Sequence, residues 1–204
     1  MAELTAVAVI TVLAVISPGA DFAMIVRNSC LYGRTAGLLA AAGIGLGVLV
    51  HVSYTVLGVG LLLSGTPAVL TAVRIAGACY LVWIGWQTFR SRVEVDTSGG
   101  PGEPPPPRGA ALRTGFLTNA LNPKTMLFVV STYTQVVDAG TPFLRQAGYG
   151  LFMSLAHLVW FGLVAGVLSA PALRTRLLRG QVPLNRAIGA VLVALGISLA
   201  LAPA

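Results

Sequence analysis

Six long apolar stretches, separated by short polar connections, make up almost the whole chain. A helix needs about 20 apolar residues to cross the hydrocarbon core of a bilayer. None of the stretches alternates with the period of two that membrane-spanning strands require. The pattern therefore predicts an all-α integral membrane protein with six transmembrane helices, over residues 4–26, 36–62, 68–89, 114–136, 143–169 and 184–202.

Two of these stretches, the first and the fourth, are interrupted by a proline next to a charged residue. The first contains Ser17-Pro18-Gly19-Ala20-Asp21, and the fourth contains Asn122-Pro123-Lys124. A proline inside a helix removes a backbone hydrogen bond, and lipid tolerates such a break only where protein buries it or it lines a cavity. A charge at the bilayer centre costs at least about 2.5–3.5 kcal/mol. We therefore expect broken helices at 17–19 and around 122–123, facing a shared polar cavity, which is typical of a transporter's substrate site.

Composition agrees with a membrane protein, since 56% of the residues are hydrophobic and 9% are charged. Soluble domains average about 25% charged residues. The net charge of +7 comes from arginines in the connections, without the basic face and interleaved aromatics of a nucleic-acid-binding protein. The odd-numbered connections carry nine basic residues, whereas the even-numbered ones carry only Arg145. The nine are Arg27, Arg34, Arg90, Arg92, Arg108, Arg113, Arg174, Arg176 and Arg179.

This distribution of charge predicts the topology. Basic loops remain in the cytoplasm, so the odd connections are expected to be cytoplasmic and both termini outside the cell membrane. The N-terminus has neither a basic region nor a cleavage site after its apolar run, so the first stretch is interpreted as a retained span rather than a signal peptide.

The two halves of the chain repeat the same features in the same order. Pro18 and Pro123 are 105 positions apart, and His51 and His157, the only histidines, are 106 apart. Arg74-Ile-Ala-Gly77 likewise parallels Arg186-Ala-Ile-Gly189. Two repeats of three spans enter the membrane in opposite senses, so we expect two inverted three-helix repeats, an architecture of secondary transporters.

The predicted units are therefore residues 1–89, a first repeat, and residues 114–204, a second repeat of the same membrane domain. Residues 90–113 join them as a Pro- and Gly-rich cytoplasmic linker that acts as a tether. Glycine is abundant, with 24 residues, and small residues at close spacing let helices approach one another. Such spacing occurs at Gly43, Gly45 and Gly47 and at Gly162-xxx-Gly166.

Three motifs together resemble the LysE/RhtB family of amino-acid exporters, and the resemblance covers nearly the whole chain apart from the linker. Ser17-Pro18-Gly19-Ala20-Asp21 is similar to that family's S-P-G-P-D motif, with Ala20 where the family usually has proline. The third span, Gly77-Ala78-Cys79-Tyr80-Leu81-Val82-Trp83-Ile84-Gly85-Trp86, and the segment Phe116-Leu117-Thr118-Asn119-Ala120-Leu121-Asn122-Pro123-Lys124 resemble two further signatures. The resemblance implies export of amino acids or close derivatives, driven by the proton gradient, with no enzymatic activity; it does not fix the substrate.

The chemistry of the two breaks suits a zwitterionic substrate. A carboxylate is stabilised at helix N-termini, which the half-helices after each proline supply, and Lys124 adds a cation. Asp21 and carbonyls freed by the breaks can bind the ammonium, while Asn119 and Asn122 add neutral donors and acceptors. Low dielectric favours the neutral acid of Asp21, whereas nearby Lys124 favours the carboxylate. Asp21 is thus the candidate proton carrier; the alternative is a structural Asp21–Lys124 ion pair that locks the halves together.

The histidines admit two interpretations. They could relay protons or bind substrate, or they could hydrogen-bond across helices. The candidate substrate-binding residues are Ser17, Pro18, Gly19, Asp21, His51, Asn119, Asn122, Pro123, Lys124 and His157. The aromatics near span ends fit interface anchors rather than substrate contacts; these are Tyr32, Trp83, Trp86, Tyr133 and Tyr149.

Two other functions compete with amino-acid export. Cys30 and Cys79 lack CxxC spacing and give no zinc signature, yet a membrane thiol–disulfide carrier would share a six-span plan. A divalent-metal exporter would need a cluster of ligands that two histidines and one carboxylate do not make. We expect no cofactor and no metal. The expected partners are an amino-acid substrate and the lipid bilayer, and the sequence allows a homo-oligomer.

Overall fold

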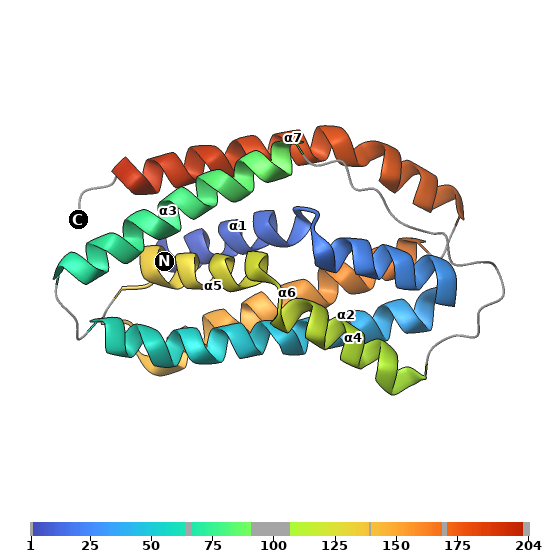
Figure 1. Cartoon of the computed structure of the whole chain (residues 1–204), viewed down its shortest axis with the longest axis horizontal. Coiled ribbons are helices and arrows are strands. Elements are labelled where there is room, and N and C mark those ends of the chain that lie inside the picture. The colour runs from blue at the N-terminus through green and yellow to red at the C-terminus, as the bar shows by residue number, and fades with distance from the viewer. Residues whose placement is uncertain (1, 64–66, 91–106, 139, 169–170, 202–204) are drawn as a thin grey trace.

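The chain folds into a bundle of helices that run roughly along one axis (Figure 1). The computed structural model describes residues 2–63, 67–90, 107–138, 140–168 and 171–201, and every regular element in these ranges is a helix. The all-α prediction is confirmed. The helices are α1 (Ala2–Ile16), α2 (Ala20–Leu63), α3 (Pro67–Arg90), α4 (Arg108–Ala120), α5 (Pro123–Val136), α6 (Phe143–Leu168) and α7 (Pro171–Leu201).

The first break separates α1 from α2 at the position predicted from Pro18 and Gly19. Residues 17–19 are non-helical, and Ala20 is the first residue of α2. The first helical position is where proline is best tolerated, because its missing N–H would have no partner there. A proline at position 20 would therefore start α2 rather than break it. Alanine at this position leaves the break at 17–19 unchanged.

The second break, at 121–122, has a local explanation. A residue before proline is pushed out of the α region, and Asn122 has φ −80° and ψ 109°. Pro123 then opens α5, and the Asn122 side chain accepts a hydrogen bond from the backbone N–H of Lys124 at 3.0 Å. This N-cap satisfies one of the donors that every helix start leaves free.

The two halves contain the same order of elements: a short helix, a break, a second short helix and two long helices. In the first half the second short helix and the first long one are merged into α2, which bends at Gly33 with φ 82°, a value that favours glycine. Figure 1 shows that α1 and α4 run in opposite senses, as do α3 and α7. These directions agree with an inverted repeat, whose superposition remains a prediction.

Several helix boundaries differ from the predicted ones. The linker was expected to extend to residue 113, but α4 already begins at Arg108, and residues 91–106 lie outside the described part. The sixth span was expected from residue 184, whereas α7 begins at Pro171. Two described stretches are long and apolar enough to cross a bilayer by themselves, Ala20–Gly58 and Phe143–Val167. The breaks and boundaries divide the other apolar sequence into shorter pieces, so the count of six spans stays a prediction.

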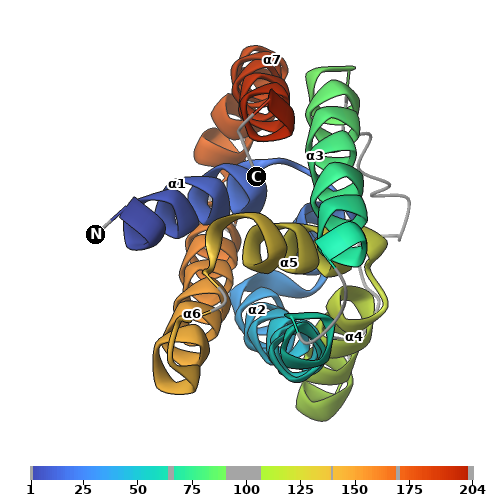
Figure 2. The ribbon, with the colours of Figure 1, turned by 90° about the vertical axis from the view of Figure 1, so that its left-hand side faces the viewer.

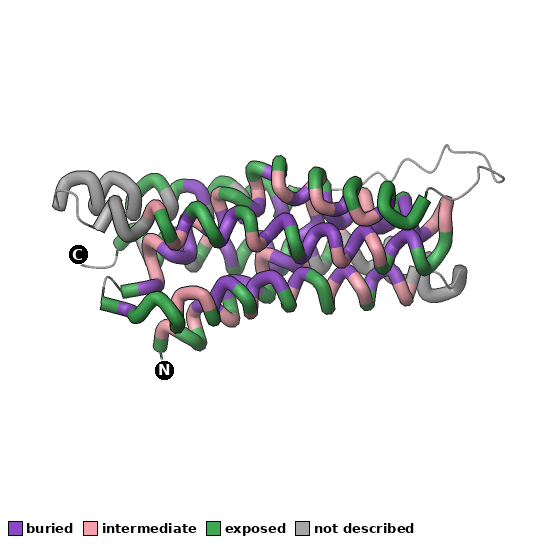
Figure 3. The backbone as a smooth tube through the Cα atoms, turned by 90° about the horizontal axis from the view of Figure 1, so that it is seen from below, coloured by how far each residue is buried: buried purple, intermediate pink, exposed green. Residues whose placement is uncertain are grey.

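Buried residues gather on the inner helix faces (Figure 3), and many large apolar side chains are exposed on the outer ones. Along α6 these include Leu151, Leu155, Leu158, Val159 and Leu163, all more than a third exposed. An apolar surface of this extent is unusual in a soluble monomer and suits contact with lipid. By contrast, Tyr133 is fully buried in the core, so the prediction that it anchors at the interface is wrong.

At two places where helices cross, glycines let the two backbones touch, and we call these places glycine crossings. A Cβ at Gly115 of α4 would collide with the backbone of Ala40 in α2, and one at Gly43 would collide with the Leu112 carbonyl and lie 2.6 Å from the Phe116 nitrogen. In the same way, a Cβ at Gly189 of α7 would lie 2.5 Å from the Gly85 carbonyl oxygen in α3. Figure 2 shows the consequence: α3 and α7 form one side of the bundle, α2 and α4 lie on the opposite side, and α1 and α5 lie between them.

The glycine crossings predict which glycines tolerate a side chain. Gly115→Ala should destabilise the protein by about 1–3 kcal/mol, because a backbone neighbour cannot move aside. The expected spacing motif Gly162-xxx-Gly166 differs: a Cβ at Gly162 meets nothing closer than 3.7 Å, and one at Gly166 meets nothing within 4 Å. Gly166→Ala should therefore keep or raise the melting temperature in detergent, and a loss equal to that of Gly115→Ala would contradict this account.

The start of α1 is fixed to the connection between α5 and α6 by the Glu3 carboxylate. Glu3 Oε1 accepts hydrogen bonds from the backbone N–H of Asp138 at 2.8 Å and the Thr141 hydroxyl at 2.7 Å. Its Oε2 accepts one from the Tyr149 hydroxyl at 2.9 Å. Tyr149 is thus buried against Glu3 rather than free to anchor the interface. Three donors therefore hold the ends of α1, α5 and α6 together.

These bonds predict a pH dependence of stability. The hydrogen bond from the Asp138 N–H, with smaller contributions from Thr141 and Tyr149, lowers the pKa of Glu3, which precedes the first predicted span, from 4.5 to about 2. A lowered pKa contributes stability that is present above pH 4.5 and is lost as the pH falls toward 2. In detergent, the melting temperature of the wild type should decline across this window. Glu3→Gln should melt lower at neutral pH and lack this part of the decline; equal pH curves for both proteins would contradict it.

Candidate functional site

Asp21 lies in the first turn of α2 with 6% of its surface exposed. Its Oδ2 accepts hydrogen bonds from Asn119 Nδ2 at 2.8 Å, Asn122 Nδ2 at 3.1 Å and Thr125 Oγ1 at 3.4 Å. All three donors come from the other half of the chain, around the second break. Its Oδ1 is buried and has no hydrogen-bond partner among the described residues. One oxygen of the carboxylate is thus fully bound and the other is available.

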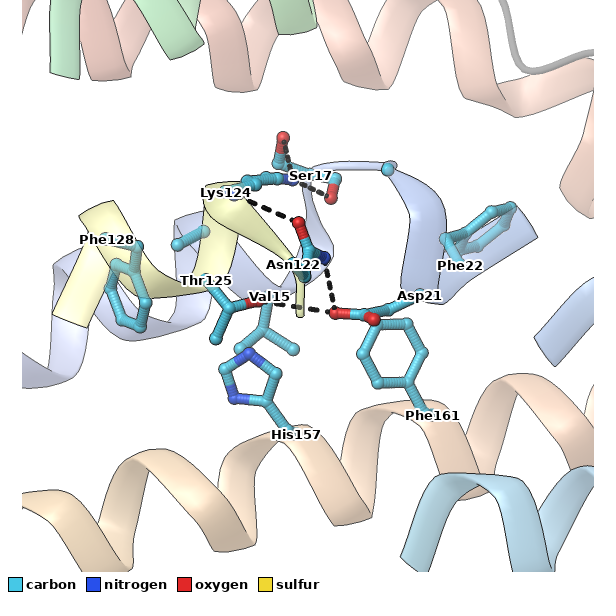
Figure 4. Close-up of a pocket in the computed structure, with 12 residues that line it drawn as sticks. Val15, Ser17, Asp21, Phe22, Asn122, Lys124, Thr125, Phe128, His157 and Phe161 are labelled. Atoms are coloured by element: carbon cyan, nitrogen blue, oxygen red, sulfur yellow. Dashed lines mark hydrogen bonds between the residues drawn. The ribbon is translucent and has the colours of Figure 1, made fainter. Parts of the chain in front are cut away.

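Lys124, in the first turn of α5, reaches back to the first break. Its ammonium donates to the Ser17 carbonyl at 2.5 Å and the Ser17 hydroxyl at 2.9 Å, and lies 3.5 Å from the Pro18 carbonyl. These are the carbonyls that the proline break sets free. The hydrogen bonds of both charges thus go to neutral groups of the opposite half and not to each other, unlike the direct ion pair that was the alternative interpretation (Figure 4).

A small cavity lies between the two charged groups and α6. Asp21 and Lys124 line it together with Ser17, Gly19 and Asn122 from the breaks. Its apolar wall includes Val15, Phe128 and Phe161. Residues of both breaks thus line one cavity with polar and apolar walls; that it is the substrate cavity stays a prediction. The volume is about 20 Å³, room for one water molecule, so this conformation does not hold an amino acid at Asp21.

The two histidines have different positions. His157 lines the small cavity, and its Nδ1 donates to the Met153 carbonyl at 2.8 Å. His51 lies behind the site: its Nε2 donates to the Asn119 carbonyl at 2.8 Å, and its Nδ1 is 2.7 Å from the Tyr54 hydroxyl. His157 thus lies on the cavity wall, while His51 supports the end of α4.

Three residues of the site were not among the predicted ones. Thr125 bonds to Asp21 and directly follows the predicted Asn-Pro-Lys motif. The Tyr80 hydroxyl donates to the Lys124 carbonyl at 2.9 Å, and Thr88 Oγ1 lies 2.6 Å from Ser17 Oγ. Tyr80 belongs to the third-span signature, whose sequence indicates no role for the individual residues. Cys30 and Cys79 form no disulfide with each other.

Comparison with known proteins decides the family. A family model described as LysE type translocator matches residues 12–202. The chain belongs to the LysE type translocator family. This translocator is 26% identical to the threonine efflux protein of Escherichia coli over 195 residues, 95% of each chain. It is 32% identical to the leucine efflux protein of Klebsiella pneumoniae over 130 residues, 63% of this chain and 61% of that one.

A further relative is the uncharacterized membrane protein YahN of Escherichia coli, 28% identical over 176 residues, which are 86% of this chain and 79% of the relative. No solved structure matches the translocator significantly. Membership of the family means that the protein is a membrane transporter, not an enzyme.

The double role of Asn122 gives a test of the site's architecture in this translocator. Asn122→Ala removes the cap of α5, which typically costs about 0.5–2 kcal/mol. Asn122→Asp keeps the cap but places a second carboxylate against Asp21, so it should be at least as destabilising at neutral pH. Exchanging both residues, Asp21→Asn with Asn122→Asp, restores a donor–acceptor pair and should recover the melting temperature in detergent. Wild-type stability of Asn122→Asp alone would contradict the contact.

Proposed function

We propose that this translocator exports amino acids or close derivatives across the cytoplasmic membrane in exchange for protons. The observation that carries the proposal is the free, buried Oδ1 of Asp21 beside a cavity that Lys124 also lines. A buried polar atom without a partner is costly, so its retention favours a function. The names of two relatives, threonine and leucine efflux proteins, support the same class of substrate.

The two charges match the two ends of an amino acid. The substrate's ammonium binds Asp21 Oδ1, while Oδ2 stays fixed by Asn119 and Asn122. Its carboxylate binds the Lys124 ammonium and the N-terminus of α2, whose first N–H groups have no partner within the helix. Because Lys124 is held by neutral oxygens, its charge is not neutralised by a direct bond to a carboxylate.

Proton coupling follows if Asp21 binds either a proton or the substrate ammonium. Both partners remove the cost of an ionised carboxylate in an apolar bundle. When the substrate leaves on the outer side, a proton replaces it; when the proton leaves on the inner side, the carboxylate is ready for the next substrate. His157, on the cavity wall, lies where it can pass a proton to this site.

Export also needs an alternation of access, because the small cavity has room for only about one water molecule in this conformation. Packed side chains of α1, α5 and α6 fill the space between it and the N-terminal end of the bundle; Val7, Ile10, Phe128, Val129 and Met153 are among them. Beyond them lie the Glu3 hydrogen bonds. With the basic connections in the cytoplasm this closed end faces outward, and release requires α1 to separate from α5 and α6.

The proposal is tested by efflux from proteoliposomes that contain radiolabelled amino acids. Asp21→Asn should abolish efflux driven by a proton gradient while the protein still folds, because an amide can bind neither a proton nor an ammonium in the same way. Lys124→Ala should raise KM by roughly tenfold to hundredfold, since hydrogen bonds to charged groups are worth about 1.5–3 kcal/mol.

Asp138→Asn is the matched control, because it replaces an exposed carboxylate away from the small cavity and keeps the backbone N–H that binds Glu3. It should transport like the wild type. Full gradient-driven efflux by a well-folded Asp21→Asn protein would rule out the carrier role. Recovery of transport in the double neutral variant, Asp21→Asn with Lys124→Ala, would assign the two residues a purely structural role.

A further inference from the structure

A second and larger cavity adjoins the two breaks on the α3 side. Its volume is about 260 Å³, and α3 contributes Trp83, Gln87 and Thr88 to its wall. The opposite wall consists of the break residues Pro18, Gly19 and Ala20 together with Pro123 and Lys124. Pockets of about 300–1,000 Å³ hold drug-sized molecules. A space just below that range suits an amino acid, whereas the 20 Å³ cavity at Asp21 does not.

The two cavities share Gly19 and Lys124 as walls. A Cβ at Gly19 would lie 3.2 Å from Lys124 Cδ, so the absence of a side chain at position 19 lets the lysine chain lie against the break. The Lys124 chain therefore borders both spaces. If its ammonium leaves Ser17 for a substrate carboxylate, one ligand can bind Lys124 and extend into the larger cavity.

The charge of the larger cavity limits what can extend into it. Lys124 is the one ionisable residue among the described residues that line this space. The substrate's own carboxylate uses that cation, so an acidic side chain has no second cation and a basic side chain has no carboxylate. An unpaired charge in such a site is costly. The indole of Trp83 offers an apolar surface instead, and the Gln87 amide offers one donor group and one acceptor.

The position of Trp83 changes its interpretation. It is 50% exposed, as an interface anchor would be, yet it lies on the wall of this cavity together with Gln87 one turn later. Trp86 has nearly the same exposure, 53%, but it stacks on Phe89 and is covered by Arg90 at 4.9 Å. The two tryptophans therefore have different surroundings on the same helix.

We propose that the larger cavity binds the substrate's side chain, and that Trp83 and Gln87 restrict export to amino acids with uncharged side chains. Thr88 acts as a positioning residue: its bond to Ser17 holds the hydroxyl that binds Lys124. The inference rests on the proposed amino-acid export and adds which amino-acid side chains the transporter accepts.

The test is a panel of radiolabelled leucine, threonine, phenylalanine, lysine and glutamate, with efflux from proteoliposomes. Wild type should export leucine or threonine at least about tenfold better than lysine or glutamate, a scale at which one pocket discriminates. Gln87→Glu supplies a carboxylate for a second ammonium, so the ratio of lysine to leucine export should rise by about tenfold. Gln87→Leu, of similar size, should not raise it. Trp83→Ala should raise the ratio of phenylalanine to leucine export, and Trp86→Ala should leave it unchanged.

The outcomes separate this inference from the proposed function. Export of no amino acid by the wild type would contradict amino-acid export itself. Export with a ratio that neither Gln87→Glu nor Trp83→Ala alters would overturn only the selectivity inference, as would a wild type that prefers lysine or glutamate.

A labelling experiment tests the same subsite without relying on the panel variants, some of which could fold poorly. With Cys30→Ala and Cys79→Ala as the background, the thiol introduced by Gln87→Cys should react with a maleimide. Saturating leucine or threonine should slow that reaction several-fold, while the thiol introduced by Trp86→Cys should react at the same rate with or without substrate. Equal protection at both positions, or none at position 87 in a transporting protein, would contradict a side-chain subsite here.

Discussion

The burial of one carboxylate in an apolar bundle is the constraint on which the rest of the structure depends. Asp21 is tolerated because donors from the end of α4 and the start of α5 converge on its Oδ2. Asn119 can reach it only because α2 has glycine at position 47, where a Cβ would lie 2.8 Å from that of Asn119. His51 in turn donates to the Asn119 carbonyl at the end of α4, which also accepts a hydrogen bond from the Asn122 backbone N–H at 2.8 Å. One charge thus accounts for a glycine, a histidine, two asparagines and the position of the second break.

The two breaks are chemically complementary rather than equivalent. The first supplies backbone carbonyls that bind a cation, and the second supplies amides and a hydroxyl that bind an anion. Each therefore stabilises the charge that belongs to the other half of the chain. Hydrogen bonds to neutral groups hold Asp21 and Lys124 close to the same cavity without joining them, so a zwitterion can compete for both.

The sequence predicted the features that depend on local chemistry and missed those that depend on how helices meet. Proline acts on its own backbone, so both breaks could be placed from residues 17–19 and 122–123. The sequence also indicated that Asp21 and Lys124 lie close together at the breaks, with a direct ion pair as the alternative. Which neutral atoms each of them binds depends on side-chain directions that spacing does not contain. Likewise Gly43 and Gly166 look alike in sequence, but only the first faces another backbone. Tyr80, Trp83, Gln87 and Thr88 were not predicted as site residues because nothing along α3 shows which of its faces meets the breaks.

The partners of Asp21 are 98, 101 and 104 positions away along the chain. During synthesis the first span consequently leaves the ribosome with an acidic group that has nothing to bind. At about 5–20 residues per second, the translation of the missing partners takes roughly 5–20 s. In that interval the nascent helix carries an insertion penalty of about 2.5–3.5 kcal/mol for the ionised Asp21. Otherwise the Asp21 carboxyl stays protonated, or the helix waits beside the translocation machinery. The amino-terminal half is therefore dependent on its carboxy-terminal half for stable residence in the bilayer, and biogenesis becomes cooperative across the entire polypeptide.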